Sequence, residues 1–445
     1  MLLIVRGIIW YGLYLFLILL PIGMAAVVAP ARAAQSFLVE VAVGAGFIGF
    51  SLMALEFALI TRFEAADAPF GEDSLQLFHN IMGTVALGFI LAHPILLILS
   101  GYPAACWINP FSSCANLSTQ TAFLSVVILI LLIGTSIWRK QLRIKYEPWR
   151  VFHGIFALVV IFSALVHIVI IGRYTSTFAM QVVWLIYSVL VLLLIVWYKI
   201  WTPLNNWERP WKVLENREER GDAHTLVLEP DGHKGFSFLP GQFSWIITGK
   251  TPFSLLQHPI SMSSMADIEP GGTVSFTIKS LGDWSGKKVP ALKPGDKLWL
   301  DGPHGVFSMD REQAMGYVFI AGGVGITPLY SMLQTMLERE DVRPVLLFYG
   351  VANSETMTYR EELATLAEQM DNLQIIPVFS DPDEGWGGET GFIREEILKK
   401  YLPKQYKRFK YLICGPKPLM DAMEEALPSL GVPRTRVLSE RFDMV

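Results

Sequence analysis

Charged residues and cysteines are scarce in this chain of 445 residues. Lysine, arginine, aspartate and glutamate make up 17% of it, and the formal net charge is −4. So small a charge gives no basis for nucleic-acid binding. Hydrophobic residues make up 52%, which is too many for an ordinary soluble enzyme. Of the three cysteines, Cys106 and Cys114 share the segment CWINPFSSC, which predicts either a small disulfide in an oxidising compartment or two free thiols.

The apolar excess is confined to residues 1–201. Unbroken apolar runs long enough to cross a bilayer predict six membrane spans. They cover residues 7–28, 37–60, 75–99, 121–138, 151–172 and 179–201. The first run is followed by ARAAQ and shares features with a signal peptide, but it is longer than a typical signal-peptide core. We therefore favour a retained first span over a cleaved one.

Basic residues in the short loops predict the orientation. The loop RKQLRIKYEPWR after the fourth span holds five of them, whereas the loops around Arg32 and Arg173 hold one each. Because cytoplasmic loops are enriched in lysine and arginine, this loop is expected inside the cell, and with six spans both chain ends are too. We expect a multi-pass protein of the cell membrane, a bacterial inner membrane, with its soluble half cytoplasmic.

Four of the eight histidines lie in two apolar segments, LFHNIMGTVALGFILAH and VFHGIFALVVIFSALVH. His79 and His93 are 14 residues apart, and so are His153 and His167. On an α-helix this spacing is about 3.9 turns, so both rings leave nearly the same face. Two such helices side by side predict an inner pair, His79 with His153, and an outer pair, His93 with His167. Each pair suits one haem; the alternative for any single ring is a hydrogen-bonded interior histidine.

From Lys212 onward the pattern changes to short β-type runs. HTLVLEP, FSFLPGQFSWIIT, TVSFTIKSL and GDKLWLDGPHGVF predict an antiparallel barrel that ends near Met315. Strands and helices then alternate, which predicts a parallel sheet covered by helices. The first of these strands leads into AGGVGITP, where Gly322, Gly323 and Gly325 precede a helix. Such a turn either binds pyrophosphate at the helix N-terminus or serves packing alone.

These motifs, in this order, resemble the ferric reductase and NADPH oxidase superfamily. The resemblance implies a multi-domain fold in which a six-helix transmembrane dihaem bundle precedes an antiparallel β-barrel FAD domain and an α/β parallel-sheet nucleotide-binding domain. The expected boundaries are 1–201 for the haem-binding domain, 202–212 for a membrane-surface linker, 213–314 for the FAD domain and 315–445 for the NAD(P)H domain. The implied cofactors are FAD, two b-type haems and NADPH or NADH.

The resemblance also assigns site residues, although each barrel motif alone would read as an ordinary β-turn. For FAD it implies His258, Pro259, Ile260 and Ser261 in HPIS, Lys279, Gly282, Asp283 and Ser285 in IKSLGDWSGK, and Gly302, Pro303 and Gly305 in LDGPHG. For the nicotinamide dinucleotide it implies Gly322, Gly323, Gly325 and Thr327, with Cys414, Gly415 and Pro416 of CGPKPLM. Catalytic positions are Ser261, Cys414, Glu440 and Phe442, the last stacking on the flavin. A buried inert thiol is the alternative for Cys414.

The function implied is electron transfer from cytosolic NAD(P)H through FAD and both haems to a small extracytoplasmic acceptor. Oxidases of the family usually place a histidine one turn after the outer ligand, where this chain has Leu97, and an arginine in the second span, which has none. We therefore expect ferric chelate rather than oxygen, with a superoxide-generating oxidase as one alternative. A transporter or sensor regulated by its nucleotide-binding module is another. The loop VANSETM favours neither nicotinamide, since Glu355 opposes a 2′-phosphate while Ser354 or Arg360 would serve one.

Overall fold

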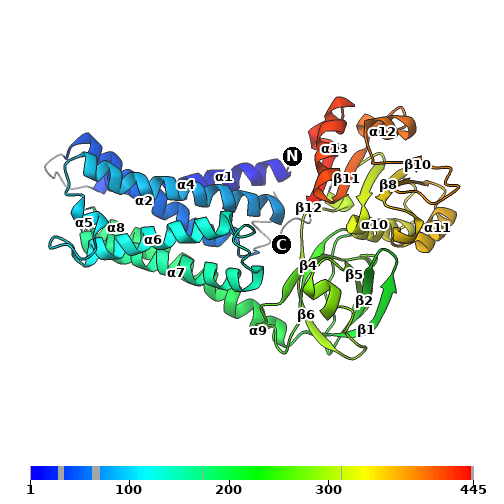
Figure 1. The fold of residues 1–445 in the computed structure, drawn as a ribbon, viewed down its shortest axis with the longest axis horizontal. Helices are drawn as coiled ribbons and strands as arrows, with labels where there is room; N and C mark the ends of the chain where they lie inside the picture. Colours follow the sequence, from blue (N-terminus) through cyan, green and yellow to red (C-terminus); the bar gives the residue numbers. More distant parts are fainter. Residues whose placement is uncertain (1, 29–34, 63–70, 173, 312, 442–445) are drawn as a thin grey trace. The chain divides into compact units, whose positions relative to one another are not determined.

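The computed structural model describes residues 2–28, 35–62, 71–172, 174–311 and 313–441, which are the coloured parts of Figure 1. The chain divides into two compact units, Met1–Trp201 and Thr202–Val445.

Six helices among the described residues of the first unit are long and apolar enough to cross a membrane, and they run alongside one another (Figure 1). They are α1 (Leu2–Val28), α2 (Phe37–Leu59), α4 (Glu72–Leu99), α6 (Leu117–Ile137), α7 (Tyr146–Ile171) and α8 (Phe178–Val196). A π-helical turn, Trp197–Trp201, extends α8, and the short helix α5 (Ala105–Ile108) lies between α4 and α6. The six predicted spans are confirmed, and the protein is a multi-pass membrane protein.

Helix α2 is the most enclosed of the six. In its most apolar stretch 61% of the residues are buried, against 11% in α4 and in α6, because α2 packs against α1, α4, α7 and α8. Gly46 on α2 allows close approach to α4: a Cβ atom there would lie 3.1 Å from Nδ1 of His93. The helices that surround α2 turn much of their apolar surface outward, as lipid-facing helices do.

The second unit begins with a six-stranded antiparallel sheet in the order β4-β3-β6-β1-β2-β5. The strands are β1 (Pro210–Glu219), β2 (Ala223–Pro230), β3 (Phe243–Ile247), β4 (Gln257–Ser261), β5 (Val274–Lys279) and β6 (Lys297–His304). A β-bridge between Met262, directly after β4, and Phe276 of β5 joins the two edges. The sheet therefore closes into the antiparallel barrel that the alternating runs predicted.

The structure adds detail to one local expectation for this region and corrects another. The stretch 202–212, expected as a linker, contains helix α9 (Thr202–Trp207) and the start of β1 at Pro210. The strand expected from Phe236 begins only at Phe243, because Pro240 has no N–H to donate to a neighbouring strand. Both segments contain proline, which usually marks a turn and so weakens the signal of a strand.

A parallel sheet in the order β10-β9-β8-β7-β11-β12 completes the unit. Its strands are β7 (Tyr317–Gly322), β8 (Val345–Val351), β9 (Leu373–Phe379), β10 (Glu389–Thr390), β11 (Lys410–Gly415) and β12 (Val437–Arg441). Helices α10 (Ile326–Glu338) and α11 (Arg360–Gln369) cover one face, and α12 (Glu395–Tyr401) and α13 (Lys417–Ser429) cover the other. The predicted α/β fold is confirmed, and the strand order reverses between β7 and β11.

Candidate functional site

The four membrane histidines form the two expected pairs. Helix α4 carries one member of each pair and α7 the other. The ring centres are 6.2 Å apart in the inner pair, His79 with His153, and also 6.2 Å apart in the outer pair, His93 with His167. An imidazole nitrogen binds a metal at about 2 Å and lies about 1 Å from its ring centre, so two imidazoles on opposite sides of one iron have ring centres about 6 Å apart. Both pairs therefore fit bis-histidine ligation of a haem.

The Nδ1 atom of each ring faces a group on a neighbouring helix. The partners are the carbonyl oxygen of Ala42 for His93 (2.7 Å), the carbonyl oxygen of Ser118 for His167 (2.9 Å), the hydroxyl of Ser136 for His153 (3.3 Å) and the carboxylate of Glu56 for His79. A ligand histidine usually donates its second ring N–H to such a group, which fixes the tautomer and the ring orientation. This arrangement would leave Nε2 of every ring as the nitrogen that could bind a metal.

A cavity of about 310 Å³ opens at the inner pair. His79, His153, Glu56 and Ser136 line it, together with Trp149, whose ring centre lies 4.9 Å from that of His153. The remaining lining residues are mostly apolar side chains of α2, α4, α6 and α7. A mostly apolar cavity with a few convergent polar groups is typical of a cofactor site.

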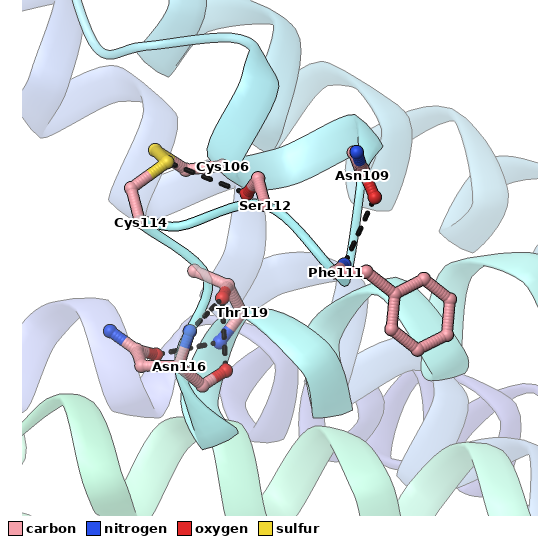
Figure 2. Close-up of a disulfide and its surroundings, with 7 residues drawn as sticks. All are labelled: Cys106, Asn109, Phe111, Ser112, Cys114, Asn116 and Thr119. Atoms are coloured by element: carbon pink, nitrogen blue, oxygen red, sulfur yellow. Dashed lines mark hydrogen bonds between the residues drawn. A yellow bond between two sulfur atoms is a disulfide. The ribbon is translucent and has the colours of Figure 1, made fainter.

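The outer pair lies near a loop closed by a disulfide between Cys106 and Cys114, whose Cα atoms are 5.3 Å apart (Figure 2). Of the two alternatives left open by the sequence, the structure has the disulfide. Next to Cys106, the ring of Trp107 meets His167 edge to face at 6.4 Å. Just beyond the loop, Asn116 and Thr119 form a capping box that starts α6. The disulfide thus closes the segment that carries Trp107 to the outer pair.

On the barrel, strand β4 contains the whole HPIS motif. Ser261 at its end is 2% exposed, and within the described chain its Oγ has no hydrogen-bond partner. Ile260 packs at the edge of the barrel core. The ring of His258 stacks on Trp284 with centres 4.0 Å apart, so HPIS lies beside the IKSLGDWSGK segment. Because buried hydroxyl groups are rarely left without a partner, Ser261 fits a bound flavin.

The other residues expected at FAD lie at the ends of β5 and β6 and in the segments that follow these strands. Lys279 ends β5, and Asp283 is exposed and pairs with Lys287 (2.8 Å). The Ser285 hydroxyl accepts hydrogen bonds from the backbone N–H groups of Leu281 and Gly282 (2.9 and 3.0 Å). It therefore already stabilises its own turn. Gly302 and Pro303 lie within the end of β6, and Gly305 follows this strand.

The glycine loop and the CGP motif meet at the carboxyl ends of β7 and β11, where the strand order reverses. Gly322 ends β7, and the turn Gly323–Gly325 leads into α10. A Cβ atom on Gly325 would lie 2.2 Å from the carbonyl oxygen of Cys414, so only glycine lets these two segments approach. Open α/β sheets bind nucleotides at this position, with the pyrophosphate at a helix N-terminus.

Cys414 is fully buried at the end of β11 and lies opposite Glu440 of the parallel strand β12. Burial, assisted by the charge of Glu440, raises the pKa of the Cys414 thiol, so the group is a neutral thiol at physiological pH. Gly415 ends β11 and Pro416 caps α13. The Thr327 hydroxyl donates to the carbonyl oxygen of Val324 (2.8 Å). Phe442 lies outside the described residues.

Sequence reasoning missed several groups at these sites. It did not place Trp107 or Trp149 beside the histidines, and it did not find the Nδ1 partners on α2 and α6. It also did not predict the contact between the Glu56 carboxylate and His79. The only sequence signal for this contact was an acidic residue inside an apolar run. Residues that meet from separate helices are not related by any regular spacing along the chain.

Two family models match the chain. "Ferric reductase like transmembrane component" matches residues 45–164, and "Oxidoreductase NAD-binding domain" matches residues 319–425. The first range includes His79, His93 and His153. Each half of the chain thus resembles a different component of one oxidoreductase architecture.

Individual relatives agree with this division. NADH-cytochrome b5 reductase 1 of Aspergillus terreus is 30% identical over 213 residues, which are 46% of this chain and 68% of that protein. The protein of the same name from Debaryomyces hansenii is 34% identical over 161 residues, 36% of this chain and 57% of that protein.

Solved structures show likeness of fold alone. The cytochrome b5 reductase domain of Ulva prolifera nitrate reductase, 21% identical, has a TM-score of 0.46 over 52% of this chain and 97% of that one. A flavohemoglobin from Malassezia yamatoensis, 16% identical, has a TM-score of 0.50 over 92% of this chain and 99% of that one.

With both family models matched in order, the chain belongs to the ferric reductase and NADPH oxidase superfamily and is an NAD(P)H-dependent, FAD-binding membrane oxidoreductase.

Proposed function

We propose that this protein transfers electrons from NAD(P)H through FAD and two b-type haems to an acceptor on the far side of the membrane, ferric chelate above all. The observation that carries the proposal is the repeated geometry of the histidines. Two ring pairs have centres 6.2 Å apart on the same two helices, and their Nδ1 atoms face other groups. A relay of proton-carrying histidines in a transporter would not require this spacing twice.

The membrane residues would bind and orient the two haems. His79 and His153 would hold the inner haem through Nε2, and His93 and His167 would hold the outer one. With two imidazoles each, the haems would supply one-electron transfer without offering their iron as a binding site for the acceptor. Trp107 lies against His167, with ring centres 6.4 Å apart. This favours small chelates that need only approach the outer pair.

The soluble residues arrange the first transfer. Bound flavin accepts two electrons as hydride from the nicotinamide and releases them singly to one-electron carriers. The N-terminus of α10 and the glycine turn before it would bind the pyrophosphate. The buried hydroxyl of Ser261 would bond the flavin ring, and the neutral thiol of Cys414 would lie beside the nicotinamide. Glu440, the neighbour of Cys414 across the strands, would border the same space.

We infer the orientation of the chain in the membrane from the basic loop between α6 and α7. The guanidinium of Arg139 lies over the rings of Tyr146 and Trp149 (5.1 and 5.5 Å), and that of Arg150 over Tyr146 (5.8 Å). Aromatic residues with arginine are typical of a membrane interface, and the excess of basic residues favours the cytoplasmic side of a bacterial inner membrane. Electrons moving outward would then be assisted by the membrane potential, about 2.3 kcal/mol per charge per 100 mV.

The test is a spectrum followed by an acceptor assay. Purified protein with its haems should develop sharp α-bands when NADH or NADPH is added. In membranes it should reduce external ferric citrate in preference to oxygen, because Leu97, 6% exposed, stands where oxidases of the family place a histidine. A colourless protein apart from flavin would refute the proposal. A superoxide yield equal to NAD(P)H consumption in the presence of ferric citrate would favour the oxidase instead.

We expect NADH to be the better donor, by about tenfold or more in kcat/KM, a difference of about 1.4 kcal/mol. Two carboxylates lie at the loop after β8, where a 2′-phosphate would bind. Asp383 accepts a hydrogen bond from the backbone N–H of Ser354 (3.0 Å), and hydrogen bonding from Ser354 lowers the pKa of Asp383, so it is charged at neutral pH. Glu355 pairs with Arg220 (2.7 Å). Because Arg220 offsets the charge of Glu355, the repulsion of the NADPH phosphate is expected to come from Asp383.

Steady-state kinetics with both nucleotides check this expectation. Asp383→Asn should reduce the preference for NADH by raising kcat/KM with NADPH. Asp421→Asn, on the exposed face of α13, should leave the ratio of the two kcat/KM values unchanged. A wild-type protein that uses NADPH as well as NADH would contradict the assignment.

A further inference from the structure

Glu56 is a buried carboxylate in the last turn of the membrane helix α2 (Phe37–Leu59). It is 9% exposed and lines the cavity at the inner pair. A buried carboxylate within a membrane span is costly and is kept mainly where it pairs with another group or serves a function. Its carboxylate oxygen Oε2 lies against Nδ1 of His79.

This contact sets His79 apart from the other three histidines. His93 and His167 face backbone carbonyl oxygens, of Ala42 at 2.7 Å and of Ser118 at 2.9 Å. His153, the other member of the inner pair, faces the Ser136 hydroxyl at 3.3 Å. All three of these partners are uncharged. Both rings of the outer pair therefore rest on neutral oxygens, whereas one ring of the inner pair rests on an acidic side chain.

The difference has a chemical consequence for a metal held through Nε2. When Nε2 is the ligand atom, Nδ1 carries the proton and donates it to its partner. A carboxylate partner fixes the ring orientation and raises the basicity of the ligand more than a carbonyl or a hydroxyl does. A more basic imidazole stabilises the ferric state over the ferrous state because the ferric ion has the higher charge.

We propose that Glu56 is a positioning residue for the inner haem: by accepting the Nδ1 proton of His79 it aims Nε2 of that ring into the cavity and gives the inner haem a lower reduction potential than the outer haem. The inference rests on the proposed function, because it assumes that the two histidine pairs hold haems. It also predicts the favoured direction of electron transfer between the two haems. Electrons passed from the inner pair to the outer pair would move to the site of higher potential.

The experiment is a potentiometric titration of the full-length protein with both haems bound, followed by the α-band. Two one-electron components are expected, and a His167→Ala protein assigns the inner one. In Glu56→Gln the amide oxygen still accepts from Nδ1, but the negative charge is gone. We expect the ferric preference of the inner haem to fall at least tenfold, which raises its midpoint by about 59 mV. The outer haem of the same molecules should not shift.

Glu40→Gln is the matched control, because it removes the same charge from the same helix at an exposed carboxylate that accepts a hydrogen bond from the Tyr174 hydroxyl (2.9 Å). It should leave the inner midpoint near that of the wild type. If the Glu56→Gln protein fails to hold the inner haem, Glu56→Asp decides. Retention of haem with a low midpoint in the aspartate variant supports a role for the charge, and loss of haem from both variants overturns the proposal.

Two other results would also overturn it. One is an unchanged inner midpoint in Glu56→Gln with both haems bound, and the other is an equal shift in Glu40→Gln. These outcomes differ from failure of the proposed function itself. In that case the wild-type protein would bind no haem at all, and no component would titrate.

Discussion

Replacing His167 with alanine is expected to abolish transmembrane ferric reduction while NADH still reduces the flavin at the wild-type rate. His167 would supply one of two axial ligands of the outer haem, and its ring centre lies 6.2 Å from that of His93. Loss of a partner of a metal ligand already costs about 10- to 100-fold in affinity or activity, so loss of the ligand should cost more than about 100-fold. The measurements are haem content per protein, stopped-flow flavin reduction and ferric citrate reduction in vesicles.

His224→Ala is the matched control. This histidine is in β2 of the barrel and its Nδ1 lies 3.2 Å from Asn216 Oδ1, so its loss should leave both haems and the external rate in place. If His167→Ala protein held a single haem and still reduced external ferric citrate at full rate, electrons would leave the protein by a path that bypasses the outer pair.

Ser261→Ala is expected to slow flavin reduction by NADH about 10- to 100-fold, because a buried hydroxyl that pairs with the flavin contributes about 1–3 kcal/mol. The same substitution should not lower the stability of the flavin-free protein. Ser261 Oγ lacks a hydrogen-bond partner in the described chain, and removing an unpaired buried hydroxyl relieves a cost rather than adding one. Stopped-flow flavin reduction and thermal unfolding of the flavin-free protein measure the two effects.

Ser244→Ala on the neighbouring strand provides the contrast. Ser244 is fully buried, and its hydroxyl donates to the carbonyl oxygen of Asp301 (3.2 Å). Its loss should lower the unfolding temperature and leave the rate of flavin reduction unchanged. The reverse pattern in the two variants would show that Ser261 stabilises the barrel and does not contact flavin.

Local sequence patterns were sufficient for the membrane helices and for the pairing of their histidines. Apolar runs predict spans because a helix must bury its backbone polar groups in lipid. A separation of 14 residues puts His79 and His93 on one face whatever surrounds them. The glycine turn before α10 was equally visible, since Gly325 approaches the Cys414 backbone too closely for any side chain.

Groups that meet from different helices were not predictable. Ala42, Ser118 and Ser136 face histidines on α4 and α7, and nothing in their neighbouring residues marks them. The same holds for the stacking of His258 on Trp284, which joins two barrel segments. Such contacts depend on how whole elements pack, whereas sequence periodicity describes one element at a time. The start of β1 at Pro210 was missed for a local reason, since proline has no N–H to donate and usually marks a turn.

The disulfide between Cys106 and Cys114 bears on the orientation of the chain in its membrane. Disulfides persist outside the cytosol and are reduced within it. A molecule inserted in the opposite orientation would therefore keep both cysteines as thiols, and the segment that carries Trp107 would not be closed by a disulfide. The proposed orientation places this loop outside the cytosol, where the disulfide would form and close the segment whose indole, that of Trp107, lies against His167.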